Sequence, residues 1–304
     1  MSAPAAVQSD AAPTLELQQL AVRSPSASWT APLSLRSDCR RVALVGDWQP
    51  LLQVLSGRAE LASGSATILG CPLESAIYRG ILGFSACDVE LPAAFTVSEY
   101  LQHAARLSHG SVSRASLDAK RALERYGLAA LEKRKLGELV LYQRRALGIA
   151  LSTLTAPAAV WLEAPLRGLD APSADYIARL CQEAGAHGRV LLSADLPSSP
   201  SPERSLLDSC EELFLLERGS LIAQGAPSAV FAQGLRYALR VKGEKIPAFA
   251  AALARAGVRL AERSEPGSFS LELPAASSEG ADLVLDAALD HGLIVLSLEP
   301  LFAA

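Results

Sequence analysis

The residues that could most clearly bind a ligand or carry out chemistry lie where an apolar strand pattern meets an apolar helix pattern. The β-branched and apolar run Val42–Val45 ends at Gly46, and the helix pattern begins at Leu51. In a phosphate-binding loop this junction reads G-x-x-x-x-G-K-[ST]: backbone amides cradle phosphate, the Lys neutralises it and the hydroxyl holds Mg²⁺. Here the junction is Gly46, Asp47, Trp48, Gln49 and Pro50, and no GK[ST] occurs anywhere in the chain. The sequence therefore predicts the scaffold of a nucleotide site without its chemistry.

Three of these junction residues oppose phosphate binding. Asp47 brings a negative charge to the place of the phosphate, and Pro50 has no amide hydrogen to donate. Trp48 has two readings, as a plug that fills the nucleotide space or as a platform on which a base stacks. We favour the plug and expect binding of ATP and Mg²⁺ to be lost or weak.

Length, composition and charge exclude several classes of protein. The chain has 304 residues, enough for about two domains, with 50% hydrophobic and 20% charged residues, a globular composition. A net charge of -4 gives no overall attraction to nucleic acid or to anionic lipid. No apolar run of membrane-spanning length is present, so we expect no direct membrane insertion. The Ala- and Pro-rich segment Met1–Pro13 predicts a disordered tail rather than a secretion signal.

The remaining polar groups do not gather into a recognisable site. The histidines His103, His109, His187 and His291 are dispersed, so we expect no metal site, and Ser152, Ser193 and Ser220 lack a hydrolase motif. Five cysteines at scattered spacings predict reduced, mostly buried thiols in the cytoplasm: Cys39, Cys71, Cys87, Cys181 and Cys210.

Strand and helix patterns alternate along the chain and favour an α/β fold with a mostly parallel sheet. Strands are expected at 15–23, 41–46, 62–70, 160–162 and 190–193, with a hairpin formed by 212–217 and 220–223. Helices are expected at 96–107, where Thr96 and Glu99 form a capping box, and at 116–126 and 143–154. The two earlier helices predict a helical subdomain over about 88–142, inserted in a core that spans 14–234.

A smaller α+β domain is expected over 235–304, with the boundary near Gly234. Its pattern reads strand-helix-strand-helix-strand, with helices at Ile246–Ala256 and Gly280–His291.

The order of these features resembles the ATP-binding subunit of ABC transporters, in the exporter branch that carries a small C-terminal domain. Six segments carry the resemblance: SGSATILG (63–70), FTVSEYLQHAARL (95–107), QRRALGIALSTLTAP (143–157), GLDAPS (168–173), LFLLERGSLIAQGAPSAVF (213–231) and GLIVLSLEP (292–300). The resemblance implies an ABC-ATPase-like RecA core with a β-rich edge and a helical subdomain, followed by the small α+β domain.

The same resemblance places substitutions at the positions that handle ATP. Cys87 stands where the family has the Gln or Glu that senses metal and water. Glu163 keeps a carboxylate at the metal position, but Ala164 replaces the general base that polarises the attacking water. Asp195 replaces the switch histidine, and a carboxylate there would repel the γ-phosphate.

The family's LSGGQ signature is replaced by Leu139, Val140, Leu141, Tyr142 and Gln143. Bulky apolar groups thus stand where Ser and Gly would approach phosphate. The loop Gly168, Leu169 and Asp170 matches the family, and we expect it to form a dimer or partner interface together with the altered signature.

The resemblance implies a catalytically inactive ABC ATP-binding-protein homologue, a non-hydrolysing subunit or partner of an export complex that acts by binding proteins rather than by turnover. Its expected partners are an active ATPase subunit, or a second copy, and a permease contacted through 87–100. It would then lie in the cytoplasm, peripheral at the inner face of the membrane. Two alternatives stay open: a soluble scaffold or regulator that uses the apolar segment 139–142 for protein binding, and an ATPase with unconventional nucleotide contacts.

Overall fold

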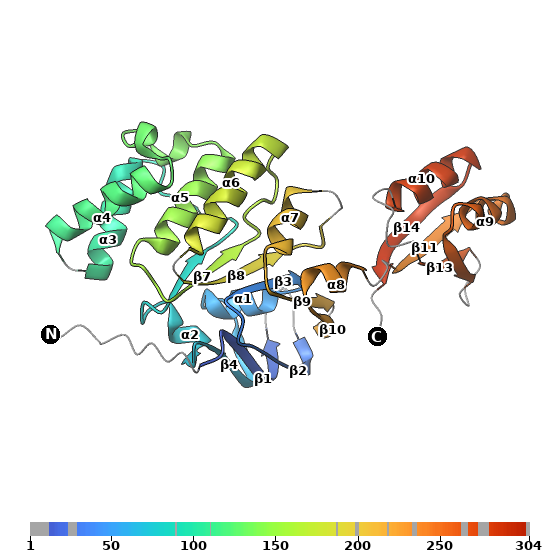
Figure 1. Ribbon diagram of the computed structural model, residues 1–304, viewed down its shortest axis with the longest axis horizontal. Helices are drawn as coiled ribbons and strands as arrows, with labels where there is room; N and C mark the ends of the chain where they lie inside the picture. The colour runs from blue at the N-terminus through green and yellow to red at the C-terminus, as the bar shows by residue number, and fades with distance from the viewer. Residues whose placement is uncertain are drawn as a thin grey trace.

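The computed structural model describes most of the chain and divides it into a larger α/β unit and a smaller C-terminal unit (Figure 1). The described residues are 12–23, 29–88, 90–109, 111–186, 188–197, 201–217, 219–232, 236–262, 267–272 and 280–301. The expected disordered tail lies almost wholly outside them, as do Gly234 at the proposed boundary, His187, and Arg218 in the hairpin turn.

A six-stranded sheet forms the centre of the larger unit, in the order β10-β9-β3-β8-β7-β6. The strands are β3 (Arg41–Gly46), β6 (Leu82–Ser85), β7 (Ala159–Glu163), β8 (Arg189–Ala194), β9 (Glu212–Glu217) and β10 (Ser220–Gly225). Neighbours pair in parallel except β9 and β10, which form the predicted antiparallel hairpin. Because these strands are parallel, their carboxyl ends meet at one edge, where α/β proteins place their ligands.

Helices cover one face of this sheet. They are α5 (Leu141–Thr153), α6 (Ala171–Ala184), α7 (Pro202–Asp208) and α8 (Pro227–Ala232). Alternate strand residues such as Val45, Leu162 and Leu192 point into this layer and form one core with the helices. The expected helix at 143–154 is therefore confirmed, beginning two residues earlier.

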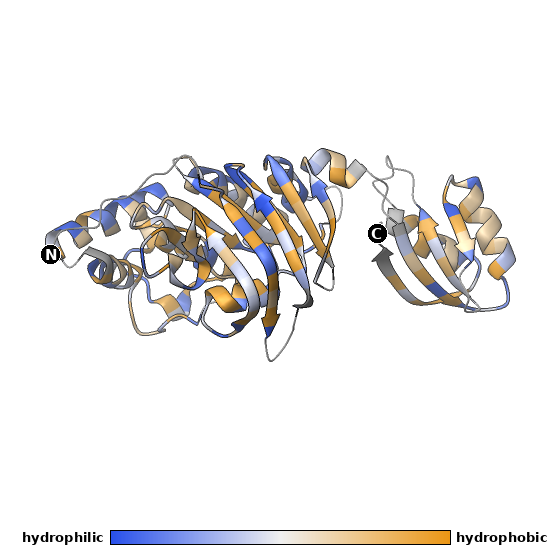
Figure 2. Cartoon of the chain, turned by 90° about the horizontal axis from the view of Figure 1, so that it is seen from below, coloured by the Kyte–Doolittle hydropathy of each residue, from blue (hydrophilic) through white to orange (hydrophobic). Residues whose placement is uncertain are grey.

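The opposite face packs on a second sheet, in the order β2-β1-β4-β5 (Figure 2). Its strands are β1 (Leu15–Arg23), β2 (Trp29–Ser37), β4 (Glu60–Ile68) and β5 (Cys71–Pro72), and the short helices α1 (Gln49–Leu55) and α2 (Leu73–Ala76) complete the layer. Strand β2 was not predicted, although Leu33 and Leu35 alternate with exposed residues along it. This sheet is the β-rich edge that the family resemblance implied.

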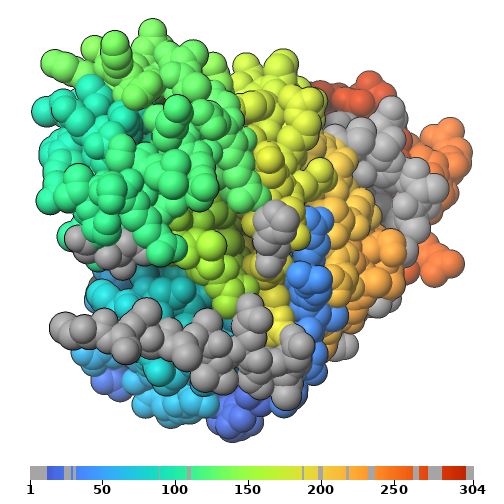
Figure 3. Space-filling view, turned by 60° about the vertical axis from the view of Figure 1, so that its left-hand side comes forward, coloured from blue at the N-terminus to red at the C-terminus, as the bar shows by residue number. Residues whose placement is uncertain are grey.

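The helical subdomain contains α3 (Val97–His109) and α4 (Val112–Arg125), followed by two 3₁₀ turns at Ala129–Leu131 and Leu136–Glu138. Figure 3 shows it in green, above the N-terminal sheet in blue. The capping box is confirmed, because the Glu99 carboxylate accepts the Thr96 amide at 2.8 Å and the Glu99 amide donates to the Thr96 hydroxyl at 3.2 Å.

The C-terminal unit is a four-stranded antiparallel sheet, in the order β12-β13-β11-β14, with two helices. Its elements are β11 (Arg236–Lys242), α9 (Ile246–Arg255), β12 (Arg259–Glu262), β13 (Ser268–Glu272), α10 (Gly280–Asp290) and β14 (Ile294–Leu301). The predicted three-strand pattern is corrected, since β12 is a fourth strand and the arrangement is βαββαβ, as in ferredoxin-like folds. The sequence pattern missed β12 because this edge strand is four residues long and mostly exposed.

Candidate functional site

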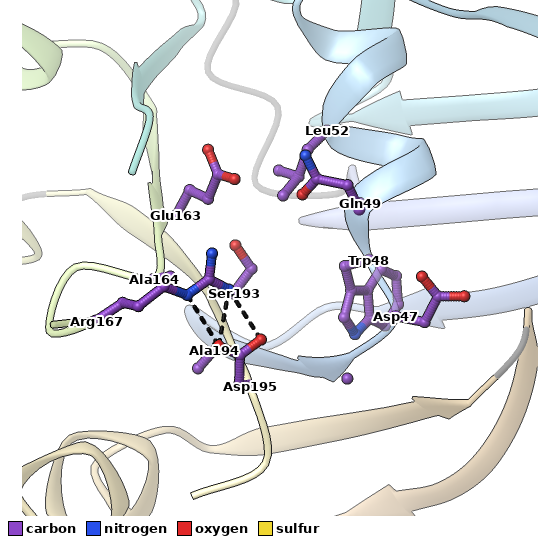
Figure 4. A pocket seen from close by; sticks show the side chains of 11 residues that line it. Asp47, Trp48, Gln49, Leu52, Glu163, Ala164, Arg167, Ser193, Ala194 and Asp195 are labelled. Atoms are coloured by element: carbon purple, nitrogen blue, oxygen red, sulfur yellow. Dashed lines mark hydrogen bonds and ion pairs between the residues drawn. The ribbon is translucent and has the colours of Figure 1, made fainter. Parts of the chain in front are cut away.

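The predicted site residues come together at the carboxyl ends of four parallel strands. Gly46 ends β3, Glu163 ends β7, Asp195 follows β8, and Cys87 follows β6. A cleft of about 260 Å³ opens between these ends and α1 (Figure 4). It is lined by Gly46, Asp47, Trp48, Gln49, Leu52, Glu163, Ala164, Arg167, Ser193, Ala194 and Asp195. Two residues of the predicted nucleotide site are not among these lining residues. Pro50 is buried in the first turn of α1, and Cys87 contacts the Glu163 carboxylate through its backbone amide.

The short β3–α1 junction uses its amides within the protein. The Asp47 amide donates to the Leu216 carbonyl at 3.1 Å, and the Trp48 amide donates to the Gly46 carbonyl at 2.9 Å. Gly46 has φ +95, and a Cβ there would overlap the Leu216 carbonyl oxygen. Only glycine fits at this point, where the end of β3 lies so close to the neighbouring strand β9. The backbone therefore stays next to the sheet at the position where a phosphate-binding loop would leave it.

The Trp48 side chain points into the core, which corrects the prediction that it plugs the cleft. Its indole is 1% exposed and packs edge-on against Trp29, with ring centroids 5.9 Å apart. The indole N–H donates to the Val45 carbonyl at 3.0 Å. Trp48 thus lies between the two sheets of the larger unit and forms part of the cleft wall, leaving the cleft open beside it (Figure 4).

Three carboxylates and one guanidinium determine the charge of the cleft. Among the described residues that line it, Asp47, Glu163 and Asp195 are the acids and Arg167 is the one basic residue. Arg167 donates two hydrogen bonds to Asp195, at 2.9 Å from Nε and 2.8 Å from Nη2. Arg167 lies in no recognisable sequence motif and was not among the predicted site residues. Its only signal in the sequence is a basic residue in the turn that follows Glu163 and Ala164.

Glu163 is held by the segment that follows β6. The Cys87 amide donates to its carboxylate at 3.1 Å. The buried Cys87 thiol lies 3.7 Å from the Ala164 carbonyl oxygen, and burial raises the pKa of this thiol. Cys87 is therefore a neutral thiol that contributes packing and a backbone hydrogen bond.

All five cysteines are free, and four of them are buried, as the sequence predicted. Among the described residues, no cluster of three or more His, Cys, Asp or Glu side chains could hold a metal ion.

The altered signature segment presents apolar side chains at the surface. Val140, Leu141 and Tyr142 are 52%, 40% and 36% exposed, whereas Leu139 is buried. Gln143 is also buried, and its side-chain oxygen accepts the Val140 amide at 3.2 Å. This bond orders the start of α5, so the three exposed residues are held on a rigid element.

The loop Gly168–Asp170 lies beside this segment. A Cβ added to Gly168 would be 3.5 Å from the Leu141 side chain, which places the two predicted interface segments next to each other. Asp170 caps α6 by accepting the Ser173 amide at 3.0 Å, and hydrogen bonds from the Ser173 side chain and then its amide lower the pKa of this carboxyl. Leu169 packs against the core.

The chain is similar in sequence to the ATP-binding regions of ABC transporters, although no protein-family model matches it. It is 30% identical over 188 residues to ABC transporter G family member 31 of Oryza sativa subsp. japonica, which covers 58% of this chain and 13% of that protein. It is 26% identical over 185 residues to the probable multidrug ABC transporter ATP-binding protein YbhF of Escherichia coli (strain K12), covering 59% of this chain and 30% of that protein. The aligned region thus spans less than a third of either relative.

Solved structures of ABC ATP-binding cassettes have the same fold. CbiO1 from Clostridium perfringens, part of the ABC transporter complex cbiONQ, matches with a TM-score of 0.61 at 20% identity, covering 81% of this chain and 98% of that one. The ADP conformation of MJ1267, an ATP-binding cassette of an ABC transporter, matches with a TM-score of 0.59 at 17% identity, covering 73% and 95%. The RecA-like ABC ATPase core inferred from the sequence is confirmed. Within the part of the chain that is described, no helix is long and apolar enough to cross a membrane.

Proposed function

From this likeness to ABC ATP-binding proteins, we propose that the chain is a non-hydrolysing homologue that acts by binding protein partners in an ABC export complex. The β3–α1 junction carries the proposal. Its amides at Asp47 and Trp48 donate to carbonyl groups of the chain, and Pro50 has no amide hydrogen. The junction also has no Lys and no hydroxyl. In a nucleotide site, backbone amides would cradle the triphosphate, a Lys would neutralise its charge and a hydroxyl would bind its metal ion.

The charge of the cleft supports the same proposal. A triphosphate would enter beside three carboxylates, and the guanidinium of Arg167 in the described part of the cleft is already paired with Asp195. Like charges about 4 Å apart repel by about 4 kcal/mol at the effective dielectric of a protein surface. Ala164 offers no general base in the turn after β7. The lining residues therefore do not fit Mg-ATP, and we derive no hydrolytic step.

The surface that remains suited to binding is the apolar segment Val140–Tyr142 with the neighbouring loop Gly168–Asp170. Three consecutive apolar side chains exposed on an ordered helix start are typical of a protein interface. The proposed occupant is an ABC ATPase subunit, either active or a second copy of this chain. A permease would be contacted through residues 87–100, and it would account for any association with a membrane.

Calorimetric titration of the purified chain with Mg-ATP tests the loss of nucleotide binding. We expect no heat of binding up to millimolar ATP. A dissociation constant below about 100 μM, equivalent to about -5.5 kcal/mol, would contradict the proposal.

Affinity purification from the native host tests the partner. We expect an ABC ATPase subunit and a permease to be recovered with the chain, and Leu141→Ser to lower that recovery. Leu289→Ser is the matched control, because Leu289 is 75% exposed on α10 of the C-terminal unit, which contains none of the proposed contact segments. Recovery of other proteins without any transporter component would instead support the scaffold alternative and refute the transport role.

A further inference from the structure

We propose that Arg167 is a positioning residue that holds the turn Ala164–Asp170 in place without a bound ligand. Its guanidinium supplies the positive charge of the cleft from within the chain. The turn ends in the loop Gly168–Asp170 of the proposed partner surface, so this inference rests on the proposed function for its biological meaning. The physical claim concerns the free chain alone.

The first observation is the geometry of the ion pair. Arg167 lies in the turn after β7, and Asp195 lies directly after the neighbouring strand β8, 28 positions along the chain. Two charge-assisted hydrogen bonds of 2.9 and 2.8 Å join them, in the forked arrangement that guanidinium and carboxylate groups prefer (Figure 4). The pair therefore adds a side-chain link between the turn and the end of β8, beyond the backbone hydrogen bond that Ala164 makes to the same strand.

The second observation is that the turn is strained and needs to be held. Ala164 has φ +37, a conformation that costs a residue with a Cβ about 1–2 kcal/mol. Its amide donates to the Ser193 carbonyl at 2.7 Å, and the Arg167 amide donates to the Ala164 carbonyl at 3.1 Å. Contacts on both sides of the turn thus oppose its relaxation.

The third observation is a second arginine that supports the same turn from α5. Arg145 is only 7% exposed, and its Nη2 atom lies 3.4 Å from the Arg167 carbonyl oxygen. The same nitrogen is 3.8 Å from the carboxylate of Asp88, in the segment after β6. The side-chain Nε of Arg145 has no hydrogen-bond partner among the described residues. Burying an arginine with one donor unpaired costs free energy of folding, and the hydrogen bond of Arg145 to the turn offsets that cost.

These contacts connect the ends of β6, β7 and β8 and the start of α5 through protein groups alone. Arg145 on α5 contacts both Asp88, which follows β6, and the Arg167 carbonyl in the turn. The Arg167 side chain pairs with Asp195, which follows β8. The partner-facing loop is consequently ordered before any nucleotide arrives.

Hydrogen–deuterium exchange on the full, unliganded chain tests the inference. Asp195→Ala removes the acceptor and leaves the sequence of the turn unchanged. We expect the amides of Ala164, Arg167 and Leu169 to exchange about fivefold faster, the change expected for loss of an ion pair that is partly exposed. Arg167→Lys keeps the charge but not the fork and should give an intermediate increase.

Asp38→Ala is the matched control. The Arg36–Asp38 pair has side-chain exposures of 53% and 66%, close to the 46% and 67% of Arg167 and Asp195, but it lies at the end of β2. This variant should leave exchange in the turn unchanged. Exchange within twofold of the native chain in Asp195→Ala, or equal loosening in Asp38→Ala, would overturn the inference.

The exchange result and the proposed function can fail separately. Calorimetric binding of Mg-ATP would refute the proposed function even if Asp195→Ala loosens the turn. Unchanged exchange in Asp195→Ala would refute the role of Arg167 while the chain still fails to bind nucleotide.

Discussion

Replacement of Trp48 distinguishes a core anchor from a plug in the nucleotide site. The indole is 1% exposed, so Trp48→Ala removes a side chain that buries about 200 Å², worth about 5 kcal/mol at about 25 cal/mol per Å². Large-to-small replacements of buried aromatic residues cost about 3–5 kcal/mol, which agrees with this figure. We therefore expect Trp48→Ala to lower the free energy of unfolding of the larger unit by about 3–5 kcal/mol.

A pair of phenylalanine variants separates the hydrogen bond from the packing. Trp48→Phe keeps most of the ring volume but loses the donor to the Val45 carbonyl, so it should cost about 1–2 kcal/mol. Trp29→Phe is the matched control, because the Trp29 indole nitrogen is buried with no hydrogen-bond partner among the described residues. It should cost less than Trp48→Phe, since no bond is lost.

Urea unfolding followed by intrinsic fluorescence measures these costs. The three tryptophans are Trp29, Trp48 and Trp161, all in the larger unit, so the signal reports that unit and not the C-terminal one. A loss below about 1 kcal/mol in Trp48→Ala, together with newly gained binding of Mg-ATP, would refute the core assignment and restore the plug.

Gly46→Ala should lower the free energy of unfolding by at least about 2 kcal/mol, because the added Cβ would overlap the Leu216 carbonyl. Gly57→Ala, at φ +71 with open space around it, should cost about 1 kcal/mol. Equal losses of the two variants in urea unfolding would contradict the clash. Ala164→Gly should stabilise the fold by up to about 1 kcal/mol by relieving a positive φ, and a lower melting temperature would argue against strain there. The pKa of Cys210 is raised from 9.0 to about 12, mainly by burial, with Arg41 opposing the rise and the neighbouring acids Glu211 and Asp208 adding to it. The unfolded chain therefore loses the thiol proton first, and stability should fall from about pH 9 towards 12 by up to about 1.4 kcal/mol per pH unit, a slope that Cys210→Ala should reduce.

The class of fold and the residue types at the β3–α1 junction were predictable from the sequence alone. Local patterns were sufficient for the strand at 41–46, the helix at 143–154 and the capping box at Thr96, because each depends on near neighbours in the chain. The lack of a Lys and of a hydroxyl at the β3–α1 junction is equally a property of the sequence, since a residue type that is absent cannot be supplied by folding.

How the other groups are used depends on contacts between segments that are distant in the chain. Trp48 could face the cleft or the core, and the packing of Trp29 from β2 decides for the core. Arg167 carries no motif, and its role arises from Asp195, which the parallel pairing of β7 and β8 brings beside it. The edge strand β12 is likewise defined by its partner β13 rather than by its own pattern. In each case the deciding contact joins segments distant in the chain, which hydrophobic periodicity and local motifs do not encode.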